Sequence, residues 1–101
     1  MVCVVVAIRV KDGKVSEFVR IFRENLPNVH AEDGCIEYFP ALDVDSPLGI
    51  QDKDAQVVTI LEKWESMAHL EAHSKAPHMV TYRERVKDLV EGMTAKVVEA
   101  A

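Results

Sequence analysis

The sequence predicts an α+β fold of the ferredoxin-like type, in which one antiparallel sheet carries its helices on one face. Three observations indicate this fold class. Strand-like and helical segments follow each other in the order β-α-β-β-α-β, the two most apolar strand-like runs come first and third, and a proline interrupts the second. In this fold the first and third strands are central and the other two lie at the edges. With 101 residues, the chain is expected to form a single domain over residues 1–101.

The first strand and the first helical region follow from hydrophobic patterning. Residues 2–10 are apolar except for Arg9 and rich in β-branched side chains, which predicts a strand buried on both faces. After a turn at Asp12-Gly13, helical spacing is seen in the apolar residues Val15, Phe18, Val19, Phe22, Leu26 and Val29. Pro27 is expected to kink this helix or to restart it. Gly34 suits the left-handed conformation that often follows a helix.

The second and third strands are expected to differ in their surroundings. Residues 35–42 predict a strand at an edge or with a bulge, because Pro40 cannot donate to the ladder. Residues 43–56 are polar and predict a long loop, typical of lids or partner-binding segments. Residues 57–64 predict a third strand that is apolar at nearly every position through Leu61.

Two helices and a last strand complete the expected order. Ser66 is predicted to cap a short helix that runs to about Ser74, and Pro77 is predicted to open the next helix. The apolar stripe of that helix consists of Met79, Tyr82, Val86, Leu89 and Val90. Gly92 is expected to end it, and residues 94–99 are expected to form the fourth strand.

The open face of the sheet predicts self-association. Both helical segments cover one face in this fold, and the first and third strands barely alternate between apolar and polar residues, so the other face should be apolar. At roughly 25 cal/mol per Å² of apolar area, leaving that face in water would forfeit many kcal/mol. Sheet-on-sheet packing of two identical subunits removes this cost, which predicts a homodimer.

Charge and composition exclude several partner classes. The formal net charge of −5 disfavours nucleic acid and anionic membranes, and no apolar run approaches the ~20 residues of a membrane span. The N-terminal run resembles a strand rather than a signal peptide, so a cytoplasmic location is expected. Cys3 and Cys35 lie in apolar strand-like runs and are expected to be small buried residues, not a disulfide or metal ligands.

The candidate chemistry lies between residues 61 and 79, which contain the single tryptophan, Trp64, and three of the four histidines. Trp and His side chains at a cavity would hold a flat organic molecule that carries a proton, although an ordinary core uses them to fill space. On a helical wheel His73 lies closer than His69 to the inward-facing Leu70. The two histidines are spaced i, i+4, but no HExxH motif or acidic ligand accompanies them, so no metal site is predicted. Tyr38 suits either a core or a cavity position.

Two segments resemble the antibiotic biosynthesis monooxygenase family. Glu32-Asp33-Gly34-Cys35-Ile36-Glu37-Tyr38 resembles its E-x-G-C-x-x-Y motif, and Glu62-Lys63-Trp64-Glu65-Ser66, followed by His73 and by Pro77-His78-Met79, resembles its E-x-W-x-S…H…P-H segment. The resemblance implies a dimeric α/β barrel. It also implies a monooxygenase that oxidises a quinol-like or polycyclic phenolic substrate with O2 and needs no metal, flavin or haem. His73 would then be the general base, and Trp64, Tyr38, His78 and Met79 would contact the substrate, with His78 as a second proton-transfer candidate.

The same superfamily leaves other functions open. One alternative is an isomerase of a small hydroxyketone or phosphorylated autoinducer sugar, in which His73 moves protons without O2. Another is a non-catalytic stress-response dimer that binds a small molecule, with Trp64 and His73 as core residues. Haem-degrading members resemble the chain less, because they use an asparagine on the first strand and Val2–Val10 contains none.

Overall fold

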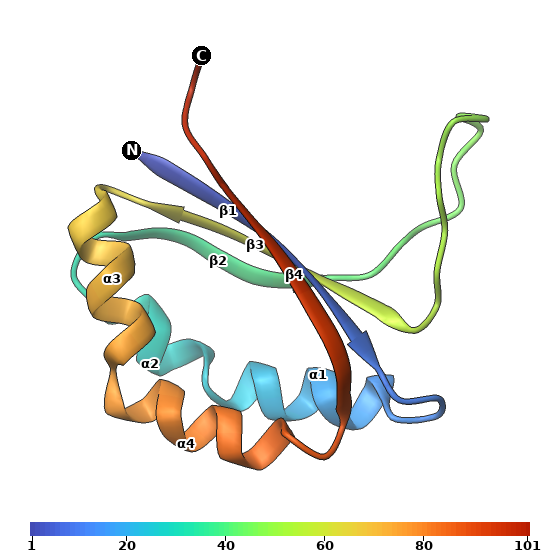
Figure 1. The fold of residues 1–101 in the computed structure, drawn as a ribbon, viewed down its shortest axis with the longest axis horizontal. Helices are drawn as coiled ribbons and strands as arrows, with labels where there is room; N and C mark the ends of the chain where they lie inside the picture. Colours follow the sequence, from blue (N-terminus) through green and yellow to red (C-terminus); the bar gives the residue numbers. More distant parts are fainter.

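The computed structural model describes residues 1–101 as one four-stranded antiparallel sheet with its helices on one side (Figure 1). The elements are β1 (Val2–Val10), α1 (Val15–Glu24), α2 (Leu26–His30), β2 (Cys35–Ala41), β3 (Val57–Trp64), α3 (Met67–Lys75), α4 (Pro77–Val86) and β4 (Val90–Val98). The strand order is β2-β3-β1-β4, and every neighbouring pair is antiparallel. The ferredoxin-like prediction is therefore confirmed, with β1 and β3 central and β2 and β4 at the edges.

The helix boundaries follow from local residue chemistry. Pro27 restarts the chain as α2, because a proline in the first turn needs no amide partner. The Ser66 hydroxyl caps α3 by accepting the His69 amide N–H, and Pro77 opens α4. Gly34 has a φ of 81°, in the left-handed region predicted for it. None of these helices is long and apolar enough to cross a membrane.

The prediction for the end of α4 is wrong. The helix ends at Val86, and β4 begins at Val90, so Gly92 lies inside the strand. Leu89 and Val90 continue the helical spacing of the apolar stripe, which is why the sequence suggested a longer helix. In the structure the Leu89 amide closes a turn on the Val86 carbonyl, and Val90 already pairs with Val10 of β1.

The central strand β1 is buried on one face within the single chain, not on both. Its even-numbered residues, from Val2 to Val10, are buried under the helices, whereas Val5 on the opposite face is 39% exposed. Cys3 lies on that open face, and Cys3 and Cys35 are free thiols that are half-buried rather than fully buried. The opposite face is therefore uncovered: Val5, Ala7 and Leu61 make its centre apolar, whereas Lys63 and Lys96 also lie on it.

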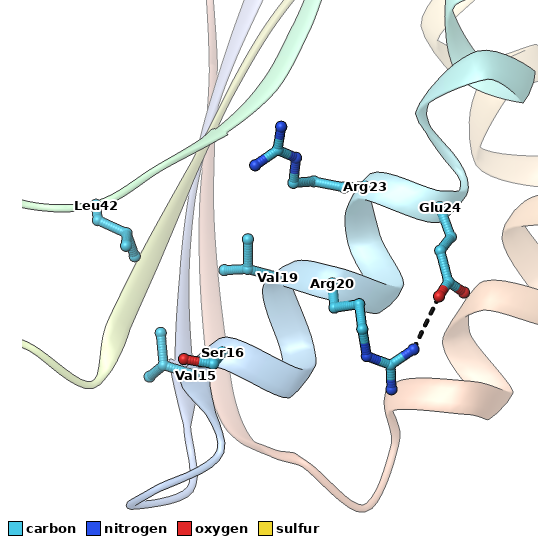
Figure 2. A pocket seen from close by; sticks show the side chains of 7 residues that line it. All are labelled: Val15, Ser16, Val19, Arg20, Arg23, Glu24 and Leu42. Atoms are coloured by element: carbon cyan, nitrogen blue, oxygen red, sulfur yellow. Dashed lines mark hydrogen bonds and ion pairs between the residues drawn. The ribbon is translucent and has the colours of Figure 1, made fainter.

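Residues 42–56 form the predicted long connection, which projects away from the sheet (Figure 1). Leu42, at its start, lies across from Val15 and Val19 of α1 and borders a hollow of about 590 Å³ (Figure 2). An ion pair between Arg20 and Glu24 runs along the helix side of this hollow, with 2.8 Å between Nη1 and Oε1. Most of its lining residues are exposed, so we regard it as a surface groove.

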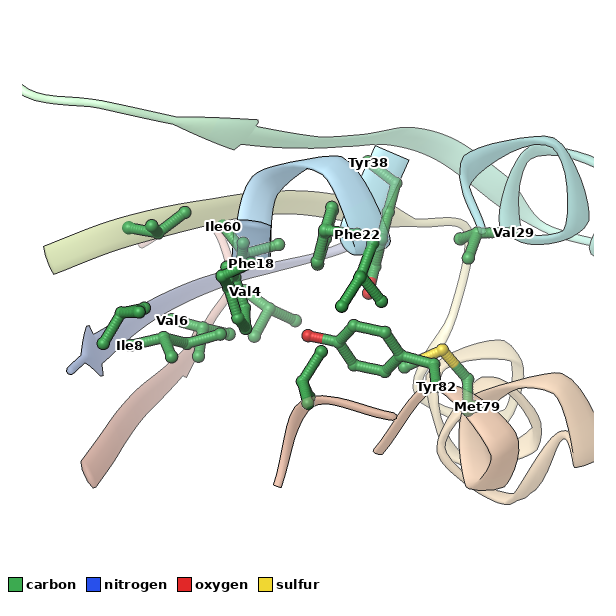
Figure 3. Close-up of a cluster of buried hydrophobic side chains, with 14 of the residues drawn as sticks. Val4, Val6, Ile8, Phe18, Phe22, Val29, Tyr38, Ile60, Met79 and Tyr82 are labelled. Carbon is green, nitrogen blue, oxygen red and sulfur yellow. The ribbon is translucent and has the colours of Figure 1, made fainter. Parts of the chain in front are cut away.

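The hydrophobic core fills the space between the helices and the sheet (Figure 3). Phe22 of α1 stacks on Tyr38 of β2, with ring centroids 5.5 Å apart. The same ring meets Tyr82 of α4 edge-on at 5.6 Å. Tyr82 extends from α4 towards Val4 and Val6 of β1. Side chains fill the space between α4 and β1 only in part, which leaves a cavity there.

Candidate active site

A cavity of about 470 Å³ lies between the sheet and the α3–α4 pair. Its walls are mostly apolar, with Val4, Val6 and Ile60 of the sheet facing Met79 and Tyr82 of α4. The residues with polar or charged groups that line it are Tyr38, Glu62, His73, Ser74, Tyr82, Arg83 and Lys87. An apolar cavity with a few convergent polar side chains is typical of a small-molecule site.

His73 is the one buried polar or charged residue of the chain, with 4% of its surface exposed. It lies in the last turn of α3, and its Nδ1 is 2.6 Å from Oε2 of Glu32, just beyond the end of α2. With Glu32 as the acceptor, the neutral imidazole carries its proton on Nδ1 and keeps a lone pair on Nε2. The other ring nitrogen, Nε2, makes no hydrogen bond within the protein, and His73 is one of the residues that line the cavity.

Aromatic side chains fix the orientation of the His73 ring. The Trp64 ring lies 4.6 Å from it, and the Tyr38 ring lies 5.1 Å from it on another side. Burial raises the pKa of Tyr38, so its phenol stays neutral near pH 7 and can donate a hydrogen bond. Tyr38 is buried and also lines the cavity, so it occupies both of the positions that the sequence left open.

The other predicted site residues divide into two groups. Met79 lines the cavity together with Tyr38 and His73. Trp64 is fully buried and His78 lies in the first turn of α4, and neither borders the cavity. His78 is instead behind His73, with Nε2 3.3 Å from the same Glu32 oxygen and Nδ1 3.2 Å from the Asn25 amide nitrogen. The structure thus brings all five residues together, but only three of them border the cavity; their roles in binding and catalysis stay predictions.

Two glutamates of this site were not singled out as site residues from the sequence. Glu32 follows a helix end, and its partner His73 is 41 positions away, so no local pattern points to the contact. Glu62 alternates with Ile60 and Trp64 on β3, which places the three side chains on one face of the sheet. The structure shows Ile60 and Trp64 to be buried, so Glu62 shares the helix-covered face with them.

Glu62 is held by the neighbouring tryptophan. The Trp64 Nε1–H donates to Glu62 Oε1 at 3.0 Å, and burial raises the pKa of this carboxyl group. The neutral form of Glu62 is therefore favoured more than that of an ordinary surface carboxyl group.

His69 serves the local structure rather than the cavity. Its ring nitrogen Nδ1 lies 2.7 Å from the Ser66 hydroxyl, and its Nε2 lies 3.4 Å from Asp33. His73 points to Glu32 instead, so the two histidines of α3 do not converge. No group of three or more His, Cys, Asp or Glu side chains in the chain is arranged to hold a metal ion.

Comparison with known proteins gives matches over most of the chain. Residues 1–85 match the family model described as "Antibiotic biosynthesis monooxygenase". The chain is 33% identical to "Probable quinol monooxygenase YgiN" of Escherichia coli K12, and the alignment covers 98% of this chain and 97% of the relative. Among solved structures, a conserved protein from Methanosarcina mazei Go1 superposes with a TM-score of 0.84 at 20% identity, over 99% of this chain and 92% of that chain. Rv0793 from Mycobacterium tuberculosis superposes with a TM-score of 0.81 at 21% identity, over 99% and 94%. At these identities the two structures support the fold alone.

Proposed function

Because the chain belongs to the antibiotic biosynthesis monooxygenase family, we propose that it oxidises a quinol-like or polycyclic phenolic molecule with O2, without metal, flavin or haem. The observation that carries this proposal is the buried His73–Glu32 pair at the wall of an apolar cavity. The similarity to a relative named as a quinol monooxygenase supports the choice of substrate class.

In this reaction His73 is the general base. Nε2 takes the phenolic proton of the substrate, and the Glu32 carboxylate stabilises the imidazolium that forms, as a carboxylate does for histidine in a catalytic triad. The electron-rich anion then transfers an electron to O2. The apolar walls hold the ring and exclude water, Tyr38 and Met79 contact it, and Trp64 and His78 keep His73 and Glu32 in place.

We also propose that the chain works as a homodimer built through the open face of the sheet. Phe39 of β2, Leu61 of β3 and Val5 of β1 form one row across this face, and Phe39 and Val5 are 41% and 39% exposed. Such a row at the centre of an uncovered sheet is typical of a surface that packs against a second sheet. The cavity lies on the opposite, helix-covered face, so dimerisation would leave its walls in place.

Oxygen uptake with menadiol and a panel of related hydroquinones tests the catalytic proposal. The wild-type protein should consume O2 well above the autoxidation rate, and dialysis against a chelator should leave that rate unchanged. His73→Gln should lower kcat by roughly 10²-fold or more, the usual contribution of a general base. Glu71→Gln, which changes an exposed side chain of the same helix, should match the wild type.

Other outcomes would contradict the proposal. Oxygen consumption at the autoxidation background across the whole panel would exclude a quinol monooxygenase. Solvent deuterium entering a hydroxyketone under nitrogen would indicate an isomerase that uses the same base. A His73→Gln variant with a lower melting temperature and no change in any assayed activity would indicate a binding protein.

A further inference from the structure

Glu62 is a carboxyl group on the apolar floor of the cavity. It lies on β3 between Tyr38 of β2 and Val4 of β1, its partners in the two neighbouring strands. All three side chains line the cavity, and Ile60 and Val6 form the next row of the floor. No lysine, arginine or histidine forms an ion pair with Glu62, although His73, Arg83 and Lys87 also line the cavity.

The hydrogen bonding of Glu62 leaves one oxygen free. Oε1 accepts the Trp64 Nε1–H, whereas Oε2 makes no hydrogen bond within the protein. In a neutral carboxylic acid the oxygen that accepts is the carbonyl oxygen, and the other oxygen carries the proton. Trp64 thus selects Oε1 as the carbonyl oxygen and leaves an O–H at Oε2 to donate to a ligand.

The surroundings of Glu62 favour this neutral form. Burial is the largest influence and raises the pKa of Glu62, and the Glu32 carboxylate raises it further. The Trp64 hydrogen bond and a charged His73 act in the opposite direction. Tyr38 from β2, Tyr82 and Arg83 from α4, and Lys87 just after α4 are the other titratable groups at the cavity. A half-buried carboxyl group that lacks an ion-pair partner costs stability, and such groups are often found at functional sites.

We propose that Glu62 is the acid partner of His73: its Oε2–H donates a hydrogen bond to an oxygen of the bound ring and then protonates the peroxide formed there. The second part rests on the proposed monooxygenase function. At one pH, this chemistry requires a carboxyl group that still holds its proton and an imidazole that can accept one.

The substrate of this sequence is a quinol with a free ring C–H. His73 takes the phenolic proton, the anion gives one electron to O2, and the radical pair forms a carbon–oxygen bond to give a ring peroxide anion. Glu62 protonates the outer peroxide oxygen and becomes a carboxylate. That carboxylate removes the ring C–H proton as the O–O bond breaks, which forms a carbonyl and releases hydroxide. The His73 imidazolium protonates the hydroxide, so quinol and O2 become hydroxyquinone and water, and both residues return to their starting states.

The first test measures binding without turnover. The titration of Glu62 is followed by ¹³C NMR of its carboxyl carbon, and menadione binding is followed by calorimetry over the same pH range. Wild-type binding should weaken roughly tenfold as Glu62 ionises, the loss expected for one hydrogen bond. Glu62→Gln, whose amide donates at every pH, should bind independently of pH. Glu62→Met, which cannot donate, should bind weakly throughout, and Glu65→Gln, at an exposed carboxylate, should behave as the wild type.

The second test measures menadiol oxidation. Glu62→Gln should lower kcat by roughly 10²-fold while KM changes less than about twofold, because the amide binds the ring and cannot give up a proton. The wild-type rate should fall as pH rises through the Glu62 titration, and this decline should be absent from the variant.

The outcomes separate the two proposals. Menadione binding that is absent, or that ignores the ionisation of Glu62, would overturn the assignment even if menadiol is oxidised. A wild-type protein that binds menadione in the expected way but consumes no oxygen would overturn the proton-donating step together with the proposed function, and would keep Glu62 as the hydrogen-bond donor.

Discussion

A single oxygen of Glu32 faces two imidazole rings. Its Oε2 is 2.6 Å from His73 Nδ1 and 3.3 Å from His78 Nε2. The shorter contact is a hydrogen bond, whereas His78 Nε2 is buried and makes no well-aligned hydrogen bond. Glu32 therefore acts on the cavity through His73, and we regard it as a positioning residue that selects the tautomer of the base.

Removing the Glu32 carboxylate should change the tautomer of His73 and leave the cavity walls unchanged, because Glu32 does not line the cavity. Glu32→Ala should convert His73 from a single Nδ1–H tautomer to a mixture, which ¹⁵N NMR of the imidazole measures directly. Menadiol oxidation should lose roughly 10–100-fold in kcat with little change in KM, as for other residues that orient a reactive histidine. Glu32→Asp should restore part of both signals. An unchanged His73 tautomer in Glu32→Ala would contradict the positioning role.

At the scale of elements, Gly34 sets the corner between α2 and β2. Its φ of 81° is in the left-handed region, and a Cβ at this position would overlap the His69 ring of α3. The Gly34 carbonyl also accepts the Glu65 amide N–H at 2.9 Å, just beyond the end of β3. This corner therefore helps to fix the position of Glu32, which lies between α2 and Gly34, relative to the helix that carries His73.

Gly13 provides a matched control for a substitution at Gly34. Its φ is 76°, and a Cβ there would meet no atom within 4 Å, so Gly13→Ala should cost only the backbone strain of about 1 kcal/mol. Gly34→Ala adds the overlap with His69 and should cost about 2–4 kcal/mol in urea unfolding. In a His69→Ala background the extra cost should disappear, which a double-mutant cycle measures. Equal losses for the two alanine variants would contradict this account.

Most of the helices and strands could be predicted from the sequence, because the spacing of apolar residues indicates which side chains are buried. The apolar runs of β1 and β3 and the proline in β2 gave the strand order, and Ser66 and Pro77 gave the starts of α3 and α4. The boundary between α4 and β4 was missed because Leu89 and Val90 face the same core as the helix, and so continue its spacing. Glu32 could not be predicted for a different reason: its contact with His73 joins residues 41 positions apart and exists only in the folded chain.

For the whole molecule, the open face of the sheet predicts the effect of a charge at its centre. Val5 lies between Leu61 of β3 and Lys96 of β4 on this face. Val5→Lys should convert a dimer to a monomer in light scattering at micromolar concentration, because an ammonium group buried between two sheets would lose its hydration and would lie beside Lys96. Val80→Lys, at an exposed valine of α4, should leave the mass unchanged. A wild-type protein that is monomeric under these conditions would exclude the homodimer.

The strand order also has a consequence for synthesis on the ribosome. β1 is made before any of its partners, yet it is the strand that pairs with both β3 and β4. One edge of this apolar strand therefore stays without a partner until the residues of β4 have emerged, and an exposed apolar edge can pair with other chains. A nascent chain that stalls before β4 should be more dependent on chaperones than the finished chain, in which β4 closes that edge.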